Sequence, residues 1–104
     1  MLRFDALTEA DRDLVGKCLE AAVEGPFFPN EEFPTLFGLE RSEVDLVRRL
    51  WPNINPLTEA AVMNSLNNLL GYPHDCSLEE TIGHSSEELK AALSRLAPWP
   101  WPAD

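Results

Sequence analysis

The chain has 104 residues, 44% of them hydrophobic, and its 18 acidic residues against 8 basic ones give a formal net charge of −10. This length and apolar content favour one folded domain with a single core over a disordered chain. The acidic residues are spread along the sequence, so binding to nucleic acid or to an anionic membrane surface by charge neutralisation is disfavoured. The charge would attract a basic protein partner, although solubility alone also explains it.

The first predicted helix begins after Thr8 and ends at Gly25. Thr8 can cap the first turn, Asp11 stands where a capping box places an acid, and Gly25 is a typical terminator. Apolar residues recur at helical spacing along one arc, which consists of Leu7, Ala10, Leu14, Val15, Cys18, Leu19, Ala21 and Ala22. We therefore expect Cys18 to be a core residue.

A proline-rich loop, Gly25–Asn30, follows this helix. Its two prolines force an extended path. Phe27 and Phe28 within it either pack inward or form an exposed patch, and inward packing is favoured. Asn30 is predicted to cap a short helix that ends at Gly38.

A third helix is predicted from Arg41 to Trp51 and ends before Pro52. Glu43 stands where a capping box around Glu40 needs its acid. The apolar arc that we expect this helix to bury consists of Val44, Leu46, Val47, Leu50 and Trp51.

The fourth predicted helix begins near Asn55-Pro56 and ends at Gly71. It carries few charges, which indicates the central helix of a bundle. Asn64, Asn67 and Asn68 form a polar face opposite its apolar arc. These amides either bond backbone groups of a neighbouring loop, such as the Pro-Phe-Phe-Pro segment, or form a recognition face for a ligand or partner.

A short turn capped by Ser77 and a last helix from Ser85 to Leu96 complete the domain. The narrow apolar stripe of the last helix places it at the edge of the bundle. The fold class that we predict is all-α: a single-domain bundle of four to five helices with ordered proline-rich loops. The helical domain covers residues 1–97, and residues 98–104 form a proline- and tryptophan-rich C-terminal segment that favours polyproline II.

Residues with catalytic or metal-binding chemistry gather at His74-Asp75-Cys76, with His84 further on. A nucleophilic cysteine needs a base within hydrogen-bond reach, but neighbouring residues of an extended loop point in different directions. A structural zinc site needs four ligands in paired spacings that are absent here. We therefore predict no catalytic residue, no metal ligand and no cofactor, and no phosphate-binding or dinucleotide-binding motif is present.

Cellular location is predicted from the cysteines and the apolar runs. Two cysteines are too few for a disulfide framework. The charged start, Met1–Asp5, does not read as a signal peptide, and no run approaches the roughly 18 apolar residues that span a bilayer. We expect a cytoplasmic protein with reduced thiols that does not enter a membrane.

Three segments together resemble a known family: Gly25-Pro26-Phe27-Phe28-Pro29, Thr35-Leu36-Phe37-Gly38-Leu39 and Asn67-Asn68-Leu69-Leu70-Gly71-Tyr72-Pro73-His74. Over residues 7–75 the chain resembles an uncharacterised family of small acidic bacterial proteins. In that pattern tryptophan commonly precedes the glutamate–phenylalanine pair and histidine follows it, whereas Glu31 and Pro34 stand here. The resemblance implies a bacterial origin and no known activity.

The sequence as a whole leaves three functions open. The favoured one is a non-enzymatic acidic protein-binding module, for example an immunity- or antitoxin-like inhibitor of a basic partner. The alternatives are a small regulatory or structural subunit that forms a homodimer, and a small enzyme with a Cys-His pair. The partner-binding residues that we predict are Asn64, Asn67, Asn68, Tyr72, His74, Trp99 and Trp101. The two tryptophans either fold back onto the domain or engage a partner.

Overall fold

The structure is a computed structural model that describes residues 4–25, 28–71 and 78–96. Its elements are η1 (Phe4–Ala6), α1 (Glu9–Glu24), α2 (Phe33–Phe37), α3 (Arg41–Leu50), α4 (Thr58–Gly71), α5 (Leu78–Ile82) and α6 (Ser86–Leu96). Within the described ranges every element is a helix and no strand occurs, which confirms the all-α prediction. The predicted short turn before the last helix is itself a helix, α5.

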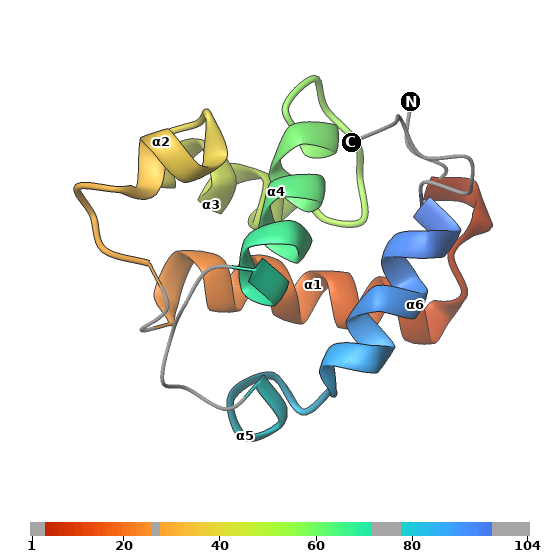
Figure 1. Cartoon of the computed structure of the whole chain (residues 1–104). Coiled ribbons are helices and arrows are strands. Elements are labelled where there is room, and N and C mark those ends of the chain that lie inside the picture. Colours follow the sequence, from red (N-terminus) through yellow and green to blue (C-terminus); the bar gives the residue numbers. More distant parts are fainter. Residues whose placement is uncertain (1–3, 26–27, 72–77, 97–104) are drawn as a thin grey trace, which may run out of the picture.

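α1 and α4 form the centre of the fold (Figure 1). α1 contacts α3, α4, α5 and α6, while α4 contacts α2 and α3 on one side and α6 on the other. The prediction of a central fourth helix is confirmed, but α1 shares that position. The radius of gyration of 12.7 Å is close to the value of about 13 Å for a compact domain of this length.

Local capping explains where α1 and α6 begin. The Asp11 backbone N–H donates to Thr8 Oγ1, and the Thr8 N–H donates to Asp11 Oδ2, both at 3.1 Å. Ser85 and Glu88 form the same reciprocal pair before α6, at 3.0 and 3.2 Å. Before α3, the Glu40 N–H donates to Glu43 Oε1 at 2.8 Å, as the capping box predicted there requires. All three pairs follow from the sequence, because each depends only on residues three positions apart.

Two other helix starts were predicted at the wrong residue. α2 begins at Phe33 after Glu32, and not after a cap at Asn30; its end at Gly38, with φ of 66°, is as expected. α4 begins at Thr58, three residues after Asn55. The Asn55 side chain instead forms a turn, since its Oδ1 accepts a hydrogen bond from the Leu57 N–H at 2.7 Å.

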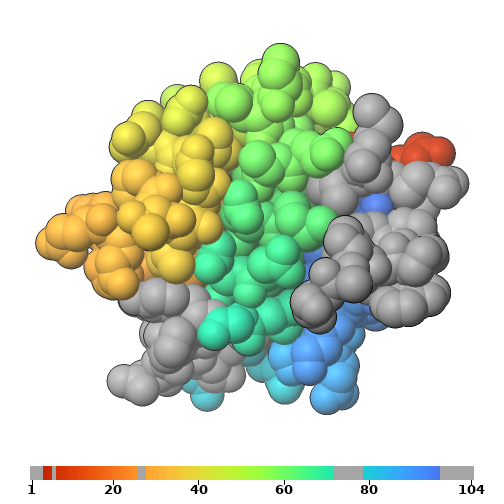
Figure 2. Space-filling view, turned by 45° about the horizontal axis from the view of Figure 1, so that its top comes forward, coloured from red at the N-terminus to blue at the C-terminus, as the bar shows by residue number. Residues whose placement is uncertain are grey.

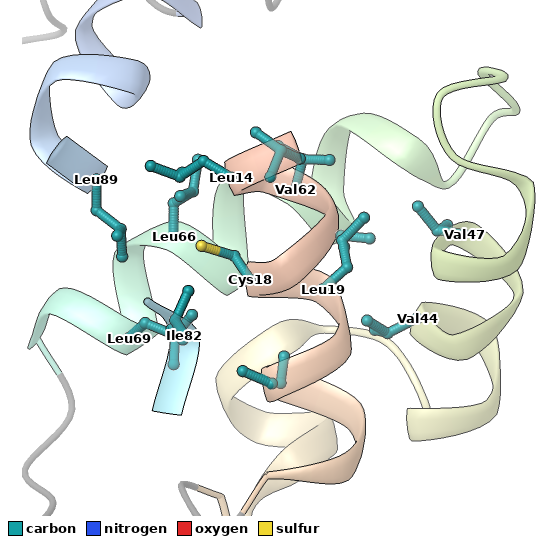
Figure 3. Packing of buried hydrophobic residues seen from close by; sticks show 14 of the residues in the cluster. Leu14, Cys18, Leu19, Val44, Val47, Val62, Leu66, Leu69, Ile82 and Leu89 are labelled. Carbon is teal, nitrogen blue, oxygen red and sulfur yellow. The ribbon is translucent and has the colours of Figure 1, made fainter. Parts of the chain in front are cut away.

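α3 buries a narrower face than its sequence predicts. Val44 and Val47 are fully buried and point toward α1 (Figure 3). Leu46 and Leu50, which we expected in the core, are 47% and 40% exposed. Helical spacing defines which residues share an arc, but the width of the arc that is covered depends on the neighbouring helices. Here α1 covers only the valine side of the arc.

The core lies between α1, α4 and the elements that pack on them. Cys18 is fully buried there among Leu14, Leu66 and Leu69, which confirms its predicted core position (Figure 3). Trp51, expected to be a core residue, is partly buried and packs against the core. Its indole Nε1 donates to the Arg12 carbonyl at 2.9 Å.

Candidate functional site

Two of the three asparagines on the face of α4 form hydrogen bonds that attach α2 to α4. Asn64 Nδ2 donates to the Phe37 carbonyl at 2.7 Å, and Asn68 Nδ2 donates to the Leu36 carbonyl at 3.1 Å. These carbonyls lie in the last turn of α2, where backbone oxygens have no partner within the helix. The geometry supports the structural interpretation for these two amides, with α2 as the neighbour. Asn67 is exposed.

The described part of the Pro-Phe-Phe-Pro loop packs inward with α2. Phe28 is 5% exposed, and its ring meets that of Phe37 edge-on at 5.2 Å between centroids. Phe37 in turn stacks on Phe33 at 4.1 Å and 3° between planes. Phe28 therefore belongs to the core, as favoured. Figure 2 shows the α2 region (yellow) lying against α4 (green).

Arg41, the first residue of α3, connects three segments. Its guanidinium donates to the carbonyls of Ala22 (3.2 Å), Val23 (2.6 Å) and Phe28 (2.8 Å). The first two carbonyls belong to the last turn of α1 and would otherwise be unpaired. The cation also lies 4.3 Å above the Phe33 ring centroid. The sequence alone gives Arg41 no role. A cation in the first turn of a helix is unfavourable to the helix dipole, however, which indicates that the side chain makes a contact outside its own helix.

Among the described residues the cysteine is buried and the histidine contacts acidic side chains. Burial raises the pKa of the Cys18 thiol to about 12, so it stays protonated at neutral pH. His84 Nδ1 lies 3.0 Å from Glu88 Oε2, and its Nε2 lies 4.0 Å from Asp13 Oδ2. The hydrogen bond from His84 is the main cause that lowers the pKa of Glu88. Within residues 4–25, 28–71 and 78–96, no group of three or more Cys, His, Asp or Glu could hold a metal ion.

The surface of the described residues includes four hollows with volumes between about 320 and 490 Å³. One of these hollows, with a volume of about 320 Å³, is lined in part by Asp11, His84, Glu88 and Arg95. These side chains already pair with one another: Asp11 with Arg95, and His84 with Glu88. This hollow therefore lies at a junction between α1 and α6 that is joined by the Asp11–Arg95 ion pair, while His84 Nε2 is buried there without a hydrogen-bond partner.

Four basic side chains of the described residues form ion pairs with acidic residues of the same chain. Lys17 pairs with Asp13, Arg48 with Asp45 and Glu24, Arg49 with Asp45, and Arg95 with Asp11. Arg41 is occupied by backbone carbonyls. Paired charges largely cancel at a distance, so the excess of 18 acidic over 8 basic residues sets the sign of the field around the protein.

Four of the predicted partner-binding residues, Tyr72, His74, Trp99 and Trp101, lie outside the described residues, as do Phe27, Asp75, Cys76 and Ser77. Besides Arg41, the sequence misplaced the two exposed leucines of α3, Leu46 and Leu50, which periodicity put in the core. In the part of the chain that the structure describes, no helix is both long and apolar enough to cross a bilayer. Comparison of the chain with protein-family models, with curated proteins and with solved structures finds no match in any of the three.

Proposed function

We propose that this chain is a non-enzymatic protein-binding module whose acidic surface receives a basic partner. The observation that carries the proposal is the pairing of arginine side chains with groups of the same fold. Arg41, Arg48, Arg49 and Arg95 are all engaged within the fold, while the chain keeps a net charge of −10. A basic partner is attracted by the excess carboxylates, and association is steered by that field.

The carboxylates available to such a partner come from several elements. Glu9 and Glu20 of α1, Glu59 of α4, Glu79 of α5 and Glu87 of α6 are exposed. A partner that uses them would bring lysine or arginine side chains. An immunity- or antitoxin-like inhibitor of a basic protein is one concrete form of this function. The bacterial setting rests on the sequence resemblance, and the cytoplasmic setting rests on the cysteine content and the apolar runs. The alternatives, a homo-oligomeric subunit and a Cys-His enzyme, gain no specific support from the described contacts.

The proposal is tested with a simple cation as the probe. Fluorescently labelled oligolysine is titrated with the full chain, and binding is followed by anisotropy at about 50 mM and about 500 mM salt, where screening differs strongly. We expect binding at low salt and at least tenfold weaker binding at high salt. A variant in which Glu9, Glu20, Glu59 and Glu87 are changed to glutamine should bind more weakly at low salt.

The matched control is labelled oligoglutamate, which should not bind under either condition. Absence of oligolysine binding at low salt would overturn the acidic binding function. Binding that is unchanged by salt and by the four glutamine substitutions would also overturn it, because the attraction would then not be electrostatic.

A further inference from the structure

His84 lies at the junction between α5 and α6, two residues after α5 ends and directly before Ser85, whose hydroxyl caps α6. Gly83 beside it has φ of 84°, a left-handed conformation that turns the chain there. The His84 side chain is 17% exposed, so most of the ring is enclosed by the protein. Its two nitrogens lie near carboxylates of different helices, Glu88 of α6 and Asp13 of α1.

The contact with Glu88 determines which ring nitrogen carries a hydrogen. His84 Nδ1 lies 3.0 Å from Glu88 Oε2. The hydrogen bond from His84 is the main cause that lowers the pKa of Glu88, so this carboxylate is ionised at neutral pH and in mild acid. An ionised carboxylate only accepts hydrogen bonds, and Nδ1 is therefore the donor. In the neutral ring Nε2 is then left with a lone pair and no hydrogen.

Nε2 of the neutral ring has no favourable contact among the described residues. The atom is buried without a hydrogen-bond partner, and Asp13 Oδ2 lies 4.0 Å away. A lone pair and a carboxylate oxygen are both acceptors, so the two atoms cannot bond. A proton on Nε2 makes that atom a donor and the ring a cation, which both carboxylates attract. The Asp13 side chain is 62% exposed and has room to close the gap.

The charges in contact with the ring or with its partners are one positive charge short of balance. Asp13 and Glu88 bring two negative charges, and Lys17, which lies 3.2 Å from the same Asp13 oxygen, brings one positive charge. Further charged groups come from the hollow and from α5, namely the balanced pair Asp11–Arg95 and the exposed carboxylates Glu79 and Glu80. Because these groups add no uncompensated cation, a proton on His84 is favoured by its surroundings.

We propose that His84 is a proton-dependent link that joins the start of α6 to α1. The protonated ring donates to Glu88 and to Asp13 at once, whereas the neutral ring loses the bond to Asp13. At the other end of α6, the Asp11–Arg95 pair keeps its charges across neutral pH, so only one of these two contacts responds there. The link does not depend on the proposed binding function.

The sign of the pH dependence follows from which state of the protein favours the proton. The folded protein holds both carboxylates beside the ring, and the unfolded chain does not. Histidine side chains ordinarily change charge between about pH 5 and pH 8, while aspartate and glutamate stay charged down to about pH 5. The link therefore stabilises the fold at about pH 5.5 and is lost as the pH rises to about 8.

A double-mutant cycle at two pH values isolates the link. Urea midpoints are measured for the native chain, His84→Asn, Asp13→Asn and the double variant at about pH 5.5 and about pH 8. Asparagine at position 84 keeps an N–H near the place of Nδ1 for Glu88 and removes Nε2. We expect the two positions to be coupled by about 0.3 M urea or more at pH 5.5 and by less than about 0.1 M at pH 8.

The matched control is the same cycle with Lys17→Gln in place of His84→Asn. Lys17 meets the same Asp13 oxygen but keeps its charge at both pH values, so its coupling to Asp13 should be equal at the two. A coupling between His84 and Asp13 that is absent at pH 5.5, or equal at both pH values, overturns the inference.

Far-UV circular dichroism establishes that each variant keeps the native helical content. If the double variant does not fold, Asp13→Asn decides alone, because Asp13 is exposed and its substitution leaves the core intact. Its urea midpoint should fall further below that of the native chain at pH 5.5 than at pH 8, since the contribution of Lys17 is the same at both. Equal losses at the two pH values overturn the inference.

Discussion

Asp11 and Arg95 form a two-point ion pair that joins the first turn of α1 to the last turn of α6. Arg95 Nε donates to Asp11 Oδ2 and Arg95 Nη2 donates to Oδ1, each at 2.5 Å. Asp11 is 4% exposed, and its Oδ2 also accepts the Thr8 backbone N–H. One carboxylate thus serves both the helix cap and a contact between residues 84 positions apart.

Replacing Asp11 with asparagine should isolate the ion pair from the cap. Asparagine keeps an oxygen for the Thr8 N–H but loses the charge that Arg95 meets. The Arg95 side chain is 45% exposed and can be rehydrated, so we expect a loss of about 1 to 2 kcal/mol in the free energy of unfolding, less than for a fully buried pair. Urea unfolding measures it.

Lys17→Gln is the matched control for the Asp11 substitution. It breaks the ion pair between Lys17 and Asp13 on the surface of the same helix, where both side chains are about half exposed. Its effect should stay below about 0.5 kcal/mol. Equal losses in the two variants would show that the Asp11–Arg95 pair contributes no more than a surface contact.

The same pair predicts how stability depends on pH. The hydrogen bond from Arg95 is the largest cause that holds the pKa of Asp11 below its ordinary value, against burial, which raises it. The folded state therefore favours the charged carboxylate, and its contribution is fully present above the ordinary pKa of about 3.9. It is lost as pH falls through the lowered pKa of the folded state.

The gap in unfolding free energy between the native chain and the Asp11→Asn variant should accordingly be constant from about pH 7 to pH 5 and shrink below about pH 4. Urea midpoints at pH 7, 5, 4 and 3 measure this gap. The other carboxylates titrate in both proteins, so the difference reports Asp11. A gap that widened at low pH would contradict the assigned direction of the shift.

Arg41 should be among the charged residues whose loss destabilises the fold most. Arg41→Met removes three hydrogen bonds to carbonyls of α1 and of the Phe28 segment, leaving part-buried oxygens unpaired. We expect a loss of about 2 to 3 kcal/mol on urea unfolding. Arg41→Lys should recover little, because an ammonium cannot reproduce the planar fork that reaches all three oxygens.

Arg49→Met provides the comparison for Arg41. Its side chain is 70% exposed and meets Asp45 on the helix surface, so the loss should stay below about 0.5 kcal/mol. If Arg41→Met were as mild as Arg49→Met, the carbonyls at the end of α1 would be satisfied without the guanidinium.

The contrast between Thr8–Asp11 and Asp11–Arg95 explains how much the sequence could predict. Thr8 caps α1 through a residue three positions away, so residue type and spacing determine the contact. Arg95 reaches Asp11 from 84 positions away, and no local pattern encodes that distance. Arg41 is a similar case, since its carbonyl partners belong to two earlier segments.

On α3, too, local spacing predicts some positions, whereas others depend on contacts with distant segments. Helical spacing correctly put Val44 and Val47 in the core, but Leu46 and Leu50 are exposed because no described element covers their side of α3. Which apolar residues of a helix remain exposed depends on the elements packed around it, and the sequence of that helix alone does not determine it. The partner-binding roles of Tyr72, His74, Trp99 and Trp101 remain predictions.

Cys18 should react with an alkylating reagent only after the protein unfolds. In a Cys76→Ser variant, Cys18 is the one remaining thiol of the chain. Burial blocks access and raises its pKa to about 12, so the thiolate that reacts is scarce at neutral pH. Labelling with iodoacetamide should be negligible in native buffer and complete in urea. Rapid native labelling would contradict the buried position.

The asparagine face can be divided by substituting its members one at a time. Asn64→Ala and Asn68→Ala should each cost about 1 kcal/mol in unfolding free energy, because the Phe37 and Leu36 carbonyls lose their donors. Asn67→Ala should be neutral or slightly stabilising, since Asn67 is exposed and alanine is the better helix former. Urea unfolding of the three variants gives the stabilities, and oligolysine titration gives the binding.

A role in partner recognition is supported for Asn67 only if its alanine variant loses affinity while keeping native stability. Asn64 and Asn68 act structurally if their variants lose stability and still bind under conditions where they are folded; normal stability in both would contradict the hydrogen bonds that attach α2 to α4.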